Sequence, residues 1–365
     1  MIKRIQIPQH TKEWFAFRKN GYGASEIAAV LSEYISNLVD YIYTSPIQVH
    51  LGKIGEDINE FSGNFRSKSG HFMEQHIIEM YRYWDNDIPD MMEMFENMEQ
   101  GRKLNHCRRA SYFEVNDDYP WLFFSPDGKE YIERNGRLIP IGLLECKNTT
   151  SMEANRYPMK VSPSFIAQVC MGLLISELEY ARILIFIDGN KLEVVTLERE
   201  SELVQEVKEH IVKYSLMSWQ RVLEALRIKE EYGIEYYYKY NVDEMTAKQQ
   251  EGVTLLQQME PDLVGTETEH DWVKDNIVPR TDEVSMELTD EQWETLVNRK
   301  KLKDEIKEGH LVRELNKCDE MLKLSLVQNG CNAATYEDQL AFSYKLDKKG
   351  TARLYVSPSI YGMRN

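Results

Sequence analysis

Three charged residues stand in an order and spacing that could hydrolyse phosphodiester bonds. Asp127 lies in a Ser-Pro-Asp-Gly segment, Glu145 follows after residues 128–144, and Lys147 comes two positions later. Side chains of a β-strand alternate between its faces, so Glu145 and Lys147 should share a face that Cys146 does not. Two charges on one face of an apolar strand are costly unless they are used or paired. The trio therefore indicates a catalytic site, the alternative being an Asp-Gly turn beside an ordinary edge-strand ion pair.

The chemistry of Mg²⁺ explains these residue types. Mg²⁺ prefers hard oxygen ligands and keeps part of its water, so Asp127, Glu145 and the backbone carbonyl of Cys146 form a suitable ligand set. A bound metal lowers the pKa of its water, and an ammonium such as that of Lys147 stabilises the transition state. We therefore expect Mg²⁺-dependent phosphodiester hydrolysis, with Mn²⁺ as a substitute for Mg²⁺.

Alternating helix and strand signals before residue 200 would position these residues. Residues 21–31 are expected to be a glycine-rich turn that leads into a short helix, and further helices are expected over 70–84 and 162–178. Residues 111–124 are expected to contain a strand that ends at Phe124, and further strands are expected over 139–147, 181–188 and 191–197. Ser25 is the expected N-cap of the first helix. This pattern predicts an α/β fold with a central mixed sheet flanked by helices.

The chain changes character near residue 201. A long helix is expected over 201–232, an acidic connection over 236–286, and a helical stretch over 289–328 that is interrupted near Gly309. After it, alternating apolar residues predict a strand that turns at 347–350 into another. We therefore predict a core domain, residues 1–200, and a mainly helical extension, residues 201–365, that ends in a small β hairpin.

Composition limits the classes of function. The five scattered cysteines form no C-x-x-C pair, which argues against a disulfide framework and a structural zinc site. The sequence contains no apolar run of membrane-spanning length and no signal peptide pattern, so we expect a cytoplasmic protein without a membrane partner. A formal net charge of −16 disfavours nucleic acid unless a local basic groove exists.

Over about residues 10–198 the chain resembles the lambda exonuclease and YqaJ-like viral recombinase branch of the PD-(D/E)XK nucleases. The matching segments, in order, are Trp14–Arg18, Gly23–Glu26, Ser45–Gly55, Gly70–Glu74, Ser125–Gly128, Leu144–Lys147 and Ile166–Val169. The resemblance implies a restriction-endonuclease-like core. It also implies a magnesium-dependent deoxyribonuclease, foremost a 5′-to-3′ exonuclease on linear double-stranded DNA in phage-type recombination or DNA processing.

The resemblance gives roles to single residues. Asp127 and Glu145 would bind the metal, and Lys147 would be the catalytic lysine. Glu74 would be a further acid near the metal, and Gln168 would lie near the lysine and the attacking water.

A second set of residues would hold the terminal 5′ phosphate of the DNA. These are Arg18, Ser25 and Ser125. Helix N-terminal amides attract phosphate, and an arginine binds it bidentately. The family's further arginine after the lysine has no match, because Glu153 stands there, and Arg156 is the candidate replacement.

The resemblance also implies partners. They are double-stranded DNA ends, a single-strand annealing protein and further copies of the chain, foremost in a ring-like trimer with DNA in a basic channel, within a bacterial or phage-infected cell. A structure-specific or restriction-type endonuclease on the same core is one alternative. A catalytically silent DNA-binding relative is another, but the intact trio of Asp127, Glu145 and Lys147 argues against it.

Overall fold

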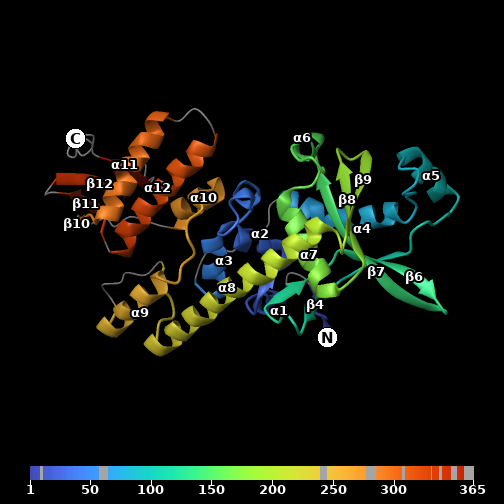
Figure 1. The fold of residues 1–365 in the computed structure, drawn as a ribbon, viewed down its shortest axis with the longest axis horizontal. Helices are drawn as coiled ribbons and strands as arrows, with labels where there is room; N and C mark the ends of the chain where they lie inside the picture. The colour runs from blue at the N-terminus through green and yellow to red at the C-terminus, as the bar shows by residue number, and fades with distance from the viewer. Residues whose placement is uncertain are drawn as a thin grey trace. The chain divides into compact units, whose positions relative to one another are not determined.

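The computed structural model describes residues 1–8, 11–56, 65–238, 245–276, 285–305, 309–329, 331–336, 339–346 and 352–356. It divides into two compact units. The first contains Met1–Leu31 and Glu60–Trp219, and the second contains Ser32–Asn59 and Gln220–Asn365. Figure 1 labels their helices and strands.

A five-stranded mixed sheet forms the centre of the first unit. Its order is β3-β6-β7-β8-β9. The strands are β3 (Cys107–Arg109), β6 (Gly128–Arg134), β7 (Arg137–Thr149), β8 (Tyr180–Ile187) and β9 (Lys191–Glu198). β7 is parallel to β8, whereas the other neighbours are antiparallel. The predicted α/β class with a mixed sheet is thereby confirmed.

A second, four-stranded sheet in this unit has the order β1-β4-β5-β2. Its strands are β1 (Ile2–Ile5), β4 (Phe113–Asn116), β5 (Leu122–Phe124) and β2 (Tyr22–Gly23). The single strand expected over 111–124 is therefore two strands, because a turn at 117–121 separates β4 from β5.

Helices complete the first unit. They are α1 (Lys12–Arg18), α2 (Ala24–Ser32), α4 (Phe65–Tyr81), α5 (Met91–Glu99), α6 (Ser151–Ala154), α7 (Pro163–Ser176) and the first part of α8 (Glu202–Tyr232). Helix α2 begins at Ala24, so Ser25 is the second residue of the helix. The prediction that Ser25 is the N-cap is therefore wrong.

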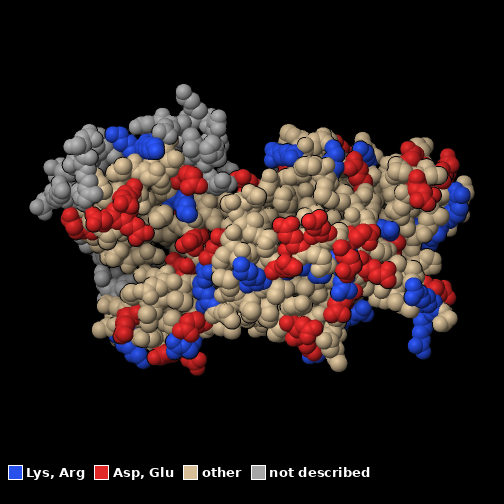
Figure 2. All heavy atoms as spheres, in the orientation of Figure 1, with Lys and Arg blue, Asp and Glu red and all other residues tan. Residues whose placement is uncertain are grey.

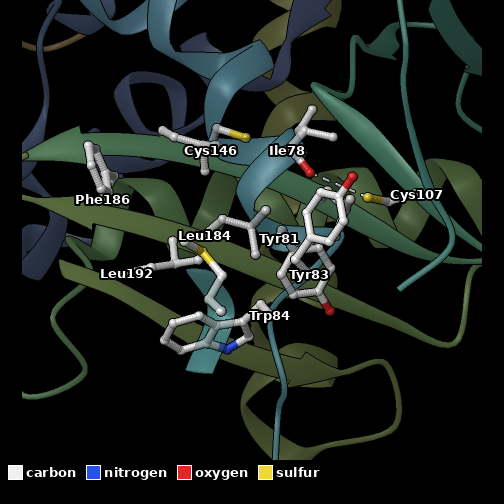
Figure 3. Close-up of a cluster of buried hydrophobic side chains, with 12 residues drawn as sticks. Ile78, Tyr81, Tyr83, Trp84, Cys107, Cys146, Leu184, Phe186 and Leu192 are labelled. Carbon is white, nitrogen blue, oxygen red and sulfur yellow. Dashed lines mark hydrogen bonds between the residues drawn. The ribbon is translucent and has the colours of Figure 1, made fainter. Parts of the chain in front are cut away.

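The strand β7 packs differently on its two faces. Leu144 and Cys146 belong to a buried cluster beneath α4, together with Ile78 and Tyr81 (Figure 3). On the other face, Glu145 is hydrogen-bonded to Gln168 of α7. The predicted separation of Glu145 from Cys146 is confirmed, because alternation along a strand is a local property of the backbone.

The second unit is mainly helical. It contains a 3₁₀ helix (Ser36–Tyr41), α3 (Pro46–Lys53), the rest of α8, α9 (Ala247–Gln257), α10 (Glu267–Asn276), α11 (Asp290–Glu305) and α12 (Gly309–Gln328). The region 236–286, expected to be a connection, thus contains two helices. Thr246 and Gln249 form a capping box at the start of α9, and Val253 and Leu256 are buried. The capping box satisfies the first backbone amides of α9, so this helix forms although it buries few apolar side chains.

The second unit also contains a four-stranded sheet. Its strand order is β10-β11-β12-β13. The strands are β10 (Ser285–Glu287), β11 (Ala333–Tyr336), β12 (Gln339–Leu346) and β13 (Ala352–Val356). The predicted terminal hairpin is β12 with β13, while its predicted turn at 347–350 lies outside the described residues. None of the helices described is long and apolar enough to cross a membrane.

Candidate active site

Three of the predicted residues form a closed set of hydrogen bonds between β7 and α7. The Lys147 ammonium donates to Glu145 Oε1 at 2.8 Å and to Gln168 Oε1 at 3.4 Å. Gln168 Nε2 donates to the same Glu145 oxygen at 2.7 Å. The ammonium also lies 4.0 Å from the centroid of the Phe165 ring. Lysine and glutamine therefore restrain each other around one oxygen of Glu145.

Asp127 lies beside this set, in the segment between β5 and β6. Its Oδ2 accepts a hydrogen bond from the backbone N–H of Cys146 at 2.8 Å, which fixes the carboxylate against β7. Desolvation by the surrounding protein raises the pKa of Asp127 well above its usual range, and the charges of Glu145 and Glu74 raise this pKa further. Asp127, Glu145 and Glu74 thus share one electrostatic environment.

Glu74 reaches this environment from α4. Its Oε1 lies 3.1 Å from His71 Nδ1, and its Oε2 accepts from Arg109 Nη2 at 3.5 Å. Burial raises the pKa of Glu74, and the charge of Glu145 raises it too, against the opposing effects of His71 and Arg109. Arg109 comes near because β3 pairs it with Gly128, the neighbour of Asp127. No role was expected for Arg109 from the sequence, and only this strand pairing shows that it borders the site.

Carboxyl groups outnumber ammonium groups at the trio of Asp127, Glu145 and Lys147. Glu145 is 3% exposed, yet its Oε2 has no hydrogen-bond partner among the residues described. Such a buried oxygen, beside a carboxyl whose pKa is raised by burial and by like charges, is suited to bind a cation. Within the described ranges, no group of three or more His, Cys, Asp or Glu residues is arranged to hold a metal ion. A cation would therefore use Asp127 and Glu145 and fill its remaining positions with backbone carbonyl and water.

The predicted phosphate-binding residues meet where α1 ends and α2 begins. Arg18 Nη2 donates to Ser25 Oγ at 3.3 Å and pairs with Glu26 Oε1 at 3.1 Å. Its guanidinium carbon stands 4.7 Å from the centroid of the Trp14 ring. The other Glu26 oxygen accepts from Gly23 N–H at 2.8 Å, as a glutamate does in the third position of a helix. The sequence reading gave Glu26 no role, although its place three residues after Gly23 is the signal for this contact.

Two further residues of the predicted phosphate set stand apart. Ser125 follows β5, and in the part of the chain described here no hydrogen bond links it to Arg18 or Ser25. Arg156, the candidate replacement arginine, is exposed and pairs with Glu153 Oε2 at 3.0 Å. The structure thus joins Arg18 to Ser25 and pairs Arg156 with Glu153, the residue that stands where the family has its further arginine.

Close packing at Gly172 brings α7 onto the sheet. A Cβ atom at this position would lie 2.8 Å from two ring atoms of Phe124 and 2.9 Å from Leu143 Cδ1. Gly172 follows Gln168 by four residues, so both lie on the same face of the helix. The missing side chain of Gly172 therefore allows Gln168 to reach Glu145.

We expect Gly172→Ala to destabilise the protein by about 1–3 kcal/mol, because overpacking outweighs the gain of about 1 kcal/mol in helix propensity. Gly70→Ala on α4 is the matched control. An added Cβ there meets nothing within 4 Å, so this substitution should be neutral or stabilise the protein by up to about 1 kcal/mol. Urea denaturation of both variants measures the difference, and effects of equal sign would contradict the packing described.

Comparison with known proteins identifies the region that carries the site. Residues 13–179 match the model of the YqaJ-like viral recombinase domain, which confirms the resemblance for that region. No curated protein matches the chain.

Solved structures to which this chain is similar include an alkaline exonuclease, LHK-Exo, from Laribacter hongkongensis. It is 15% identical, with a TM-score of 0.40, and the match covers 61% of this chain and 98% of that one. The same protein in complex with dAMP gives 16% identity, a TM-score of 0.40 and the same coverage. The structure of SSO0001 gives 10% identity and a TM-score of 0.26, covering 57% of this chain and 90% of that one.

Proposed function

We propose, from the premise that residues 13–179 form a YqaJ-like viral recombinase domain, that this protein is a Mg²⁺-dependent deoxyribonuclease that digests linear duplex DNA from its ends. One observation carries the proposal: Asp127 and Glu145 converge beside a lysine that is already held in place, and one buried oxygen of Glu145 has no partner among the described residues. When bound, Mg²⁺ would activate water and neutralise charge on the scissile phosphate.

The chain's own residues supply preorganisation. The Cys146 amide fixes Asp127, so this carboxylate needs no rearrangement before it binds a cation. Gln168 and Glu145 hold the Lys147 ammonium, which then stabilises charge that develops on the phosphate. Gln168 retains donor and acceptor capacity with which to orient an attacking water. Glu74 adds a third carboxyl group, whose pKa burial raises and His71 and Arg109 lower.

Arg18 and Ser25 support digestion that starts at a 5′-phosphorylated end. The guanidinium rests on Trp14 and has Ser25 as a neighbour, so it is ordered before the DNA arrives. Arginine offers five N–H donors, so it can bind phosphate while it keeps its contact with Glu26. A dianionic terminal phosphate would gain more from this site than an internal phosphodiester.

The test compares linear duplexes with 5′-phosphate and 5′-hydroxyl ends. We expect the wild-type protein to digest phosphorylated ends about tenfold faster or more, since a charge-assisted bidentate contact is worth on the order of 1.5–3 kcal/mol. Arg18→Ala should lose this preference and retain the rate on hydroxyl ends. Arg227→Ala, which removes an exposed arginine paired with Glu224, should keep the preference for phosphorylated ends. A wild type indifferent to the end group would refute the phosphate role and leave the hydrolysis proposal in place.

The proposal includes an oligomer, foremost a ring-like trimer, that acts on DNA ends in the cytoplasm with a single-strand annealing protein. The net charge of −16 supports it, because most of such a surface repels duplex, and a channel between subunits would bring locally basic residues together around the DNA. Light scattering of the free and DNA-bound protein distinguishes this assembly from a monomer.

A further inference from the structure

The hairpin of β6 and β7 extends past the strands beside it. β3 pairs with β6 only as far as Glu130, and β8 pairs with β7 only from Gly142 onward. Residues 132–139, here called the arm, are paired with one another in the register Ile132 to Ile139. Figure 1 shows the hairpin standing out from the sheet. An isolated two-stranded ribbon is only marginally stable in water, so its presence calls for a reason.

The arm ends in a rigid turn. Asn135 and Gly136 both have left-handed backbone angles, with φ values of 52° and 70°. Two such residues between antiparallel strands make a type I′ turn, for which Asn-Gly is the preferred sequence. The flanking residues are Arg134 and Arg137, which lie directly opposite each other in the register. The turn therefore holds two guanidinium-bearing side chains next to each other.

This placement of two arginines is unfavourable in the protein alone. Like charges at directly opposed cross-strand positions repel each other. Neither Arg134 nor Arg137 forms an ion pair within the described residues, although the chain has a net charge of −16. Three other exposed arginines are paired with carboxylates: Arg102 with Glu93, Arg156 with Glu153, and Arg227 with Glu231. The tip of the arm thus carries two positive charges without an ion pair among the described residues, unlike these three exposed arginines.

Strand alternation keeps the acid of the arm away from these arginines. Glu133 is paired with Leu138, one position from the arginine pair, and so projects from the opposite face. The same alternation separates the two exposed apolar residues, because Leu138 lies on the face of Glu133 and Ile139 on the face of the arginines. The arm therefore has one cationic face and no continuous apolar face, which favours an anionic partner over a hydrophobic protein surface.

We propose that the arm binds the phosphate backbone of duplex DNA through Arg134 and Arg137. The inference rests on the proposed function, which supplies DNA as the partner. A phosphate between the two guanidiniums would relieve their repulsion and accept charge-assisted hydrogen bonds from both. A two-stranded ribbon is also narrow enough to enter the major groove. Figure 2, in the orientation of Figure 1, shows Lys and Arg atoms protruding where the hairpin ends, so this charge is open to a large ligand.

The experiment measures binding of a short fluorescent linear duplex in Ca²⁺ over a series of salt concentrations. We expect Arg134→Ala with Arg137→Ala to raise Kd roughly tenfold at low salt. The slope of log affinity against log salt should fall by about 1.8, since each lost phosphate contact lowers it by about 0.9. Arg134→Lys with Arg137→Lys keeps the charge and should retain most of the slope. Arg102→Ala with Arg227→Ala removes the same charge from exposed, ion-paired sites and should leave Kd nearly unchanged.

Equal weakening of binding in both alanine doubles would overturn the proposal, because net charge alone would then explain the result. It would also be overturned if the arm double altered the molar mass in light scattering with DNA affinity intact, which would assign the arm to a second copy of the chain. If the arm double binds and cleaves duplex as well as the wild type does, the proposal for the arm is refuted and the proposed function stands. A wild type that neither binds nor cleaves duplex would refute the proposed function together with it.

Discussion

Replacing Lys147 with glutamine is expected to slow cleavage of linear duplex DNA by about 10²–10³-fold. The ammonium is held by Glu145 Oε1 at 2.8 Å and by Gln168, so its position is fixed before substrate binds. Preorganised charge of this kind stabilises the transition state without the cost of reorienting water. Glutamine removes the positive charge but keeps an amide donor for the buried Glu145, so the variant should stay folded.

Single-turnover cleavage rates and near-UV circular dichroism measure the two expectations separately. Lys191→Ala is the matched control, since Lys191 is an exposed lysine on β9 that also pairs with a glutamate two positions along its strand. Its cleavage rate should equal that of the wild type. A normally folded Lys147→Gln protein with the wild-type rate would show that the catalytic lysine has been misassigned.

Asp127→Asn is expected to abolish cleavage and, in chelator, to stabilise the protein by on the order of 1 kcal/mol. Desolvation first, and then the charges of Glu145 and Glu74, raise the pKa of Asp127. The folded protein therefore holds a proton that the unfolded chain releases, and stability falls as pH rises above the unfolded pKa of about 3.9. At neutral pH this cost is present, and asparagine removes it while still accepting the Cys146 N–H.

Urea denaturation with chelator and with Mg²⁺ or Mn²⁺ tests this prediction independently of activity. The metal should stabilise the wild-type protein by mass action and have little effect on Asp127→Asn. Glu96→Gln changes one exposed carboxylate of α5 and should leave both the metal response and the chelator stability unchanged. An Asp127→Asn protein that gains as much from metal as the wild type would exclude Asp127 as a ligand. One that is less stable than the wild type in chelator would contradict the electrostatic cost assigned to Asp127.

The sequence was sufficient for features that depend on the local backbone. Alternation along one apolar strand placed Glu145 and Lys147 on one face and Cys146 on the other, and the structure agrees. The family resemblance added Gln168, which the structure brings within hydrogen-bond distance of both charged residues. That these side chains meet is a structural finding, whereas their catalytic roles remain predictions.

Features that depend on tertiary pairing were missed. β6 was not predicted from the sequence, although Asn135-Gly136 is a strong hairpin signal. The charged residues Glu133, Arg134 and Arg137 obscure the alternation of apolar residues that would indicate a strand. Arg109 reaches the site only through the pairing of β3 with β6. The position of Ser25 was misjudged because a helix can be capped by a glutamate in its third position, as Glu26 does here, without a polar side chain at its N-cap.

The most direct test of the proposed nuclease activity is digestion of linear and covalently closed circular duplex DNA by the purified protein, with Mg²⁺, with Ca²⁺ and with excess chelator. Because Asp127 and Glu145 offer hard oxygen ligands, we predict that Mg²⁺ or Mn²⁺ supports digestion and that Ca²⁺ binds without supporting it. We predict complete loss of the linear duplex with Mg²⁺, intact circles, and no digestion in chelator. Full digestion in chelator would contradict metal-dependent hydrolysis, and cleavage of the circles would contradict an enzyme that starts from ends.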